Sequence, residues 1–131
     1  MLASAPTCVD PDAPIAHAHL DLRCQTSAPT FSADVDAVMA AAGLDPHAYP
    51  NWLGGLQVVA AMFFRMTGER TVKLRLETTN DDGCRRYHVD RSYLRLLCTY
   101  RGKGTEWLGD AQVDRAALGA RAPNERIVRF G

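Results

Sequence analysis

The apolar pattern of this chain changes its period at Gly68. Before that glycine, apolar residues recur at helical spacing in two segments, with Gly43 and Gly68 as predicted stops. After it, Val72, Leu74 and Leu76 alternate with charged residues, which predicts a strand with one buried face. The pattern therefore predicts an α+β fold, with N-terminal helices packed on an antiparallel sheet or partial barrel.

The two predicted helices differ in their expected burial. The first is predicted to be capped by Ser32, with Asp34 and Asp36 in its first turn, where acidic side chains favour a helix N-terminus. The second runs from 52 to 66 and carries a broad apolar face. We expect this second helix to be the central buried one.

Further short elements are predicted after the strand. Residues 86–90 and 94–100 have the composition of two more strands, and an extended pattern resumes at 105–108. A short helix is predicted at 114–118 and a last strand at 126–130. The strands among these elements would complete the sheet.

Length and proline content set the expected domain organisation. A chain of 131 residues, 47% of them hydrophobic, is long enough for one core and too short for two ordinary domains. Four prolines interrupt the first thirty residues. We expect residues 1–30 to be an arm, either loop or a short strand laid on the domain, and residues 31–131 to form a single globular domain.

The charge balance argues against partners that are recruited by a strong field. Fifteen basic residues match fifteen acidic ones, so neither nucleic acid nor a membrane surface is an expected partner. The partner that we expect is an unknown small molecule. There is no long apolar run and no secretory start, so a cytoplasmic location is expected. The four cysteines form no C-x-x-C pair, which argues against a zinc knuckle.

His88 and Asp90 are the residues that most suggest chemistry. They lie two apart on a predicted strand, so both side chains should leave the same face and converge on one divalent metal ion. Non-haem iron sites of the facial type use two histidines and one carboxylate, of which this pair supplies two ligands. The alternative is structural, with His88 simply hydrogen-bonded to Asp90.

A second possible site and one buried or solvent-facing arginine are also predicted. A second possible metal cluster, His17, His19 and Asp21, lies in the proline-rich arm, where a solvated segment is the alternative. Arg95 falls in an otherwise apolar predicted strand, so it should either pair with Glu77 or Glu106 or face solvent.

A set of residues with fixed spacings precedes and fills the segment 84–108: Arg75, Leu76, Glu77, Cys84, Arg86, His88, Asp90, Arg95, Leu96, Leu97, Thr99, Tyr100, Gly102, Gly104, Thr105, Glu106 and Trp107. This pattern resembles the signature of a bacterial family, domain of unknown function 1826. Tyr87 in place of Phe and Lys103 in place of Pro are mild departures from that signature.

The same segment is similar, more distantly, to the iron-binding strand of prolyl-hydroxylase-like oxygenases. That similarity implies a partial double-stranded β-helix of cupin-like type. Those enzymes carry a second metal histidine downstream and a basic residue for an oxoacid cosubstrate, whereas this chain has no histidine after His88. We therefore expect that the chain is incomplete at its C-terminus or has lost the third ligand, and we do not expect an oxoacid cosubstrate.

Three functional hypotheses follow. The first is a metal-binding, cupin-like domain related to non-haem iron oxygenases, in which His88 and Asp90 hold iron or zinc and water or Glu106 completes the shell. Arg95, Glu106 and Tyr100 would then bind a substrate, and no catalytic residue is identified. The second is a non-catalytic protein of metal homeostasis or an interaction module. The third is a structural remnant without metal.

Overall fold

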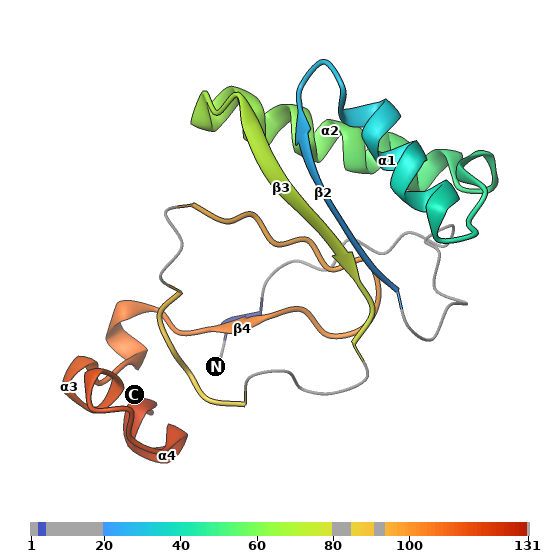
Figure 1. The fold of residues 1–131 in the computed structure, drawn as a ribbon. Helices are drawn as coiled ribbons and strands as arrows, with labels where there is room; N and C mark the ends of the chain where they lie inside the picture. The colour runs from blue at the N-terminus through green and yellow to red at the C-terminus, as the bar shows by residue number, and fades with distance from the viewer. Residues whose placement is uncertain (1–2, 5–19, 80–84, 91–93, 131) are drawn as a thin grey trace. The chain divides into compact units, whose positions relative to one another are not determined.

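The computed structural model describes residues 3–4, 20–79, 85–90 and 94–130, which fall into two compact units. One unit comprises residues 10–80, and the other comprises residues 1–9 together with 81–131 (Figure 1). The chain combines helices with small antiparallel sheets, so the predicted α+β class is confirmed. Each unit is described by itself.

The unit of residues 10–80 is a strand, two helices and a strand. Strands β2 (Asp21–Ser27) and β3 (Thr71–Glu77) pair antiparallel over seven residues, in a register that sets Leu22 opposite Leu76. Leu20 and Thr78 extend this ladder, because the amide of Thr78 donates to the Leu20 carbonyl at 2.8 Å. Helices α1 (Phe31–Ala41) and α2 (Pro50–Thr67) and the short 3-10 helix η1 (Pro46–Ala48) form the connection between the strands.

The core of this unit lies between the helices and one face of the two strands. Helix α1 packs against β2 and also contacts α2 (Figure 1). Burial alternates along the strands, as the period of two predicts, because successive side chains leave opposite faces. The buried apolar side chains are Leu20, Leu22, Phe31, Val35, Met39, Leu44, Trp52, Leu56, Phe64 and Leu76.

The helix boundaries agree with the glycine stops but not with the predicted cap. Gly43 has a φ of 79° and Gly68 a φ of 68°, the left-handed geometry that commonly follows a helix. Ser32 does not cap α1, because the helix already starts at Phe31, and Ser32 instead accepts a hydrogen bond from Gln57 of α2 at 3.0 Å. Helix α2 buries one face, on which Leu56 and Phe64 lie, as its predicted apolar face indicates, and its other face is exposed, with Met66 77% exposed.

The second unit is built from short elements. Strand β1 (Ala3–Ser4) pairs antiparallel with β4 (Glu106–Trp107), which confirms extended structure within 105–108. The 3-10 helix η2 (Asp110–Gln112) precedes α3 (Arg115–Gly119) and α4 (Asn124–Ile127). Asp114 caps α3 by accepting from the Ala117 amide at 3.0 Å, so the predicted helix at 114–118 is confirmed.

Three predicted strands of this unit are wrong. Residues 85–90 and 94–98 are irregular, and the last segment forms α4 and then a single bridge between Val113 and Val128. Alternation over five residues is a weak strand signal, because pairing with a neighbour decides whether so short a segment becomes a strand. Two two-stranded sheets are seen in the described part of the chain, and no double-stranded β-helix is seen there.

The core of the first unit predicts the effect of truncating its most buried side chain. Met39 is fully buried, so Met39→Ala should lower the free energy of unfolding by about 2–5 kcal/mol through lost contacts and a residual cavity. Urea unfolding followed by circular dichroism measures this. Val58→Ala is the control, because Val58 is 70% exposed. A loss below about 1 kcal/mol for Met39→Ala would contradict this placement of the core.

Candidate metal-binding site

His88 and Asp90 lie close together, although the segment that carries them is not a strand. The Nε2 atom of His88 is 3.2 Å from Oδ1 of Asp90. The side chains are 53% and 42% exposed, so they lie at the surface rather than in the enclosed cavity that a buried strand would have provided. The structure thus brings the two predicted ligands together in a setting that the pattern did not predict.

Asp90 also binds Arg95 through its other carboxylate oxygen. The Nη1 atom of Arg95 donates to Oδ2 of Asp90 at 2.8 Å, with the guanidinium side chain 52% exposed. Arg95 pairs with a carboxylate, but with Asp90 instead of Glu77 or Glu106, and its exposure agrees with the alternative prediction that it faces solvent. Glu77 instead pairs with Arg75 at 2.6 Å, and Glu106 accepts from the Tyr87 hydroxyl at 3.3 Å.

The second ring nitrogen of His88 faces the main chain. Its Nδ1 atom is 2.9 Å from the carbonyl oxygen of Arg86. A carbonyl can only accept, so this contact is a hydrogen bond only when Nδ1 carries the proton. A neutral ring in that tautomer presents the lone pair of Nε2 to the Asp90 carboxylate, which is also an acceptor. The gap between Nε2 and Oδ1 is therefore favourable only when a cation, either a proton or a metal ion, lies in it.

The remaining predicted substrate-binding residues lie in the same unit. Glu106 is exposed on β4, where it accepts from Tyr87. Burial, and then the negative charge of Glu106, raises the pKa of the Tyr87 hydroxyl. Tyr100 is half-buried in the segment that follows Leu94–Cys98. Roles for Arg95, Glu106 and Tyr100 in binding a substrate stay predictions.

Sequence reasoning missed two groups that support the site, the Arg86 carbonyl and the side chain of Asn124. Asn124 lies at the start of α4 and bonds the segment before His88 through both ends of its amide. Thirty-seven residues separate Asn124 from Tyr87, and no local pattern signals a contact of that range.

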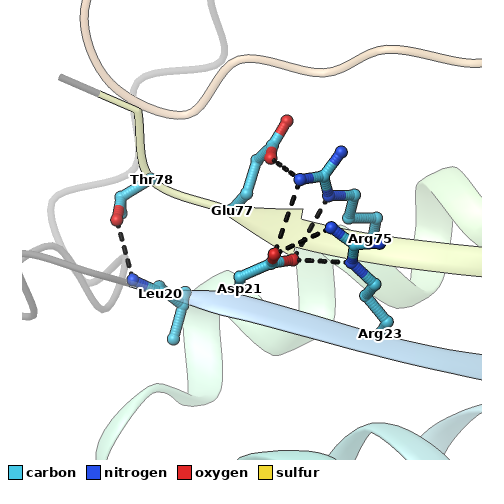
Figure 2. Close-up of polar contacts among 6 residues, drawn as sticks. All are labelled: Leu20, Asp21, Arg23, Arg75, Glu77 and Thr78. Carbon is cyan, nitrogen blue, oxygen red and sulfur yellow. Dashed lines mark hydrogen bonds and ion pairs between the residues drawn. The ribbon is translucent and has the colours of Figure 1, made fainter. Parts of the chain in front are cut away.

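The second predicted cluster is only partly within the described residues. His17 and His19 lie outside them, whereas Asp21 begins β2 and is engaged by two arginines (Figure 2). Arg23 donates to both oxygens of Asp21 at 3.0 and 2.9 Å. Arg75, opposite Arg23 in the ladder, reaches Oδ1 of Asp21 at 3.2 Å. Asp21 therefore lies between two like charges that would otherwise repel each other across the strands.

These contacts favour the ionised form of Asp21. The hydrogen bonds from Arg23 and then from Arg75 lower the pKa of the Asp21 carboxyl to about 2. The carboxylate is thus held as a structural ion pair on the solvent face of the sheet.

Among residues 20–79, 85–90 and 94–130, no group of three or more His, Cys, Asp or Glu side chains is arranged to hold a metal ion. None of the helices in the described part of the chain has the length and apolar character needed to cross a bilayer.

The sequence matches the model of one known protein family. A family model described as "Protein of unknown function (DUF1826)" matches residues 10–130, which includes the His88 segment, Arg95 and Asn124. The chain belongs to the DUF1826 family. Searches of curated proteins and of solved structures gave no match. The expected membership of DUF1826 is confirmed, whereas the relation to prolyl-hydroxylase-like oxygenases stays a prediction.

The lowered pKa of Asp21 predicts how acid affects stability. Its value in the folded chain, about 2, is below the ordinary value of 3.8, so the ion pairs stabilise the fold above about pH 4 and the effect is lost as pH falls through about 2. Asp21→Asn should therefore be less stable than wild type at neutral pH, and the difference should shrink toward pH 2 and at high salt. Thermal melts across this pH range measure it.

Asp36→Asn is the matched control for that series, because it removes one carboxylate from α1 instead of from this sheet face. Equal melting temperatures for wild type and Asp21→Asn at every pH would contradict the stabilising role of the Asp21 ion pairs.

Proposed function

We propose that His88 and Asp90 bind a divalent metal ion, zinc or iron, at the surface of this DUF1826 chain. The observation that carries the proposal is the arrangement of acceptors around His88. Its Nδ1 faces the Arg86 carbonyl at 2.9 Å, while Nε2 faces a carboxylate oxygen at 3.2 Å. Nε2 and Oδ1 would repel each other as two acceptors, whereas a divalent cation between them would bind both atoms.

The spacing of the two atoms supports chelation of a single ion. Zinc binds histidine nitrogen and carboxylate oxygen at about 2.0–2.2 Å. With bonds of about 2.1 Å, a separation of 3.2 Å between the two ligand atoms corresponds to an angle of about 100° at the metal. That angle lies between the octahedral and tetrahedral values, so the separation of the two atoms suits a single ion.

The outer contacts also suit a metal site. Ligating histidines commonly donate their other ring N–H to a carbonyl or carboxylate, which fixes the tautomer and the ring plane. The Arg86 carbonyl supplies that acceptor. Arg95 holds the Oδ2 atom of Asp90 at 2.8 Å, so Oδ1 is directed toward His88. These two contacts would orient both ligands before the ion arrives.

The number of ligands defines the kind of function. Two protein ligands leave most of the coordination shell to water, whereas structural and catalytic zinc sites usually take three or four from the protein. Binding should therefore be weak and exchangeable, which suits metal sensing or transfer better than tight storage. Facial iron oxygenases use three ligands, so an oxygenase activity and a cupin-like barrel rest on the resemblance alone.

A second candidate is the structural pair, which the same geometry favours when a proton takes the place of the metal. A doubly protonated imidazole can donate to the Arg86 carbonyl and to Asp90 at once. In that case, the His88–Asp90–Arg95 group is an ion-pair chain that orders the segment and binds no metal. Metal titration separates the two candidates.

Isothermal titration with zinc tests the proposal. The chain should bind zinc weakly near pH 7.5, and the binding should weaken as the pH is lowered, because protons compete with the metal for the imidazole nitrogen. His88→Ala and Asp90→Asn should each weaken binding by about tenfold or more. Both variants should retain the wild-type circular dichroism spectrum, since these side chains are about half exposed.

His47→Ala is the matched control, because it removes another exposed histidine, in η1, far along the chain from the proposed ligands. It should bind zinc as wild type does. Zinc binding that is unchanged by His88→Ala would place the site elsewhere, with His17 and His19 the next residues to test. An absence of zinc binding in wild type would favour the structural pair.

A further inference from the structure

Asn124 bonds the main chain on both sides of Arg86. Its Oδ1 atom accepts from the Tyr87 amide at 3.0 Å, and its Nδ2 atom donates to the Arg85 carbonyl at 2.6 Å. A side-chain amide with one acceptor and one donor can replace the neighbouring strand that the segment 85–90 lacks in the described structure. Two bonds to residues two apart restrain both the position and the tilt of this segment.

The bond to Tyr87 acts on the peptide unit that contacts His88. The Tyr87 N–H and the Arg86 C=O belong to one planar peptide unit, in which the two groups point in opposite directions. Asn124 accepts from one side of this plane, and Nδ1 of His88 lies 2.9 Å from the carbonyl oxygen on the other side. Fixing the N–H therefore fixes the direction of the carbonyl that orients the His88 ring.

A second contact ties the same segment to the helical part of the unit. The Nη1 atom of Arg86 donates to the Arg121 carbonyl at 3.0 Å. Arg121 lies between α3 and α4 and has a φ of 55°, a left-handed backbone geometry unusual for a residue other than glycine. The neighbouring helix is anchored, because Ile127 of α4 is fully buried. Asn124 is thus held on a packed element.

We propose that Asn124 is the positioning residue of the His88–Asp90 site. Through the Arg86–Tyr87 peptide it fixes the Nδ1-protonated ring orientation in which Nε2 faces Asp90. Its effect on zinc affinity rests on the proposed metal-binding function, whereas its effect on the peptide and on the His88 ring does not require metal.

Two variants of Asn124 test this in the full chain. Asn124→Ala removes both bonds, so it should speed amide exchange at Tyr87, shift the ¹⁵N resonances of the His88 ring and weaken zinc binding by about tenfold or more. Asn124→Asp retains the acceptor for the Tyr87 amide, so it should keep Tyr87 protected and recover part of the zinc affinity. Glu125→Ala, an exposed neighbour on α4, is the control and should change none of these.

The readouts separate this inference from the metal proposal. If wild type binds no zinc, the metal proposal fails, and exchange at Tyr87 with the His88 resonances still decides the role of Asn124. If Asn124→Ala does not fold, Asn124→Asp decides it: Tyr87 protection and His88 resonances like those of wild type support the inference. Rapid exchange at Tyr87 in Asn124→Asp, or wild-type exchange and ring resonances in a folded Asn124→Ala, overturns it.

Discussion

Residues 85–90 carry the site but have no strand beside them in the described structure, so contacts other than a sheet ladder restrain their conformation. Asn124 supplies two, and the Arg86 side chain adds a bond to the Arg121 carbonyl. These contacts replace a sheet ladder with side-chain and loop partners from the region of α3 and α4. The orientation of His88 depends on them, because its ring bonds a carbonyl of the same segment.

The Asp90 carboxylate contacts both neighbours in the site, because one oxygen faces His88 and the other accepts a hydrogen bond from Arg95. The guanidinium can only donate and the Arg86 carbonyl can only accept, so both ends of this chain of contacts are fixed in their roles. If the proposed metal binding holds, a proton and a divalent ion would compete for the space between Nε2 and Oδ1. The same geometry is compatible with an ion-pair chain and with the proposed two-ligand metal site.

Sequence periodicity predicted the elements that depend on local pattern, including the helices that end at Gly43 and Gly68 and the strand that follows. It also predicted the proximity of His88 and Asp90, because a spacing of two allows it even in an irregular segment. It failed where distant partners decide the outcome. Within the described residues, no neighbouring strand pairs with residues 86–90, and the bonds from Asn124 span a chain separation that no short motif encodes.

We infer that Nε2 of His88 is a metal ligand while Nδ1 donates to the Arg86 carbonyl. Nitrogen-15 NMR of the imidazole rings, recorded at about pH 7.5 with and without zinc, tests it most directly. The four histidines are assigned by comparison with single variants, His88→Gln among them. We expect that Nδ1 of His88 keeps its proton and that zinc shifts the Nε2 resonance. Protons on both nitrogens that persist unchanged in excess zinc would contradict it.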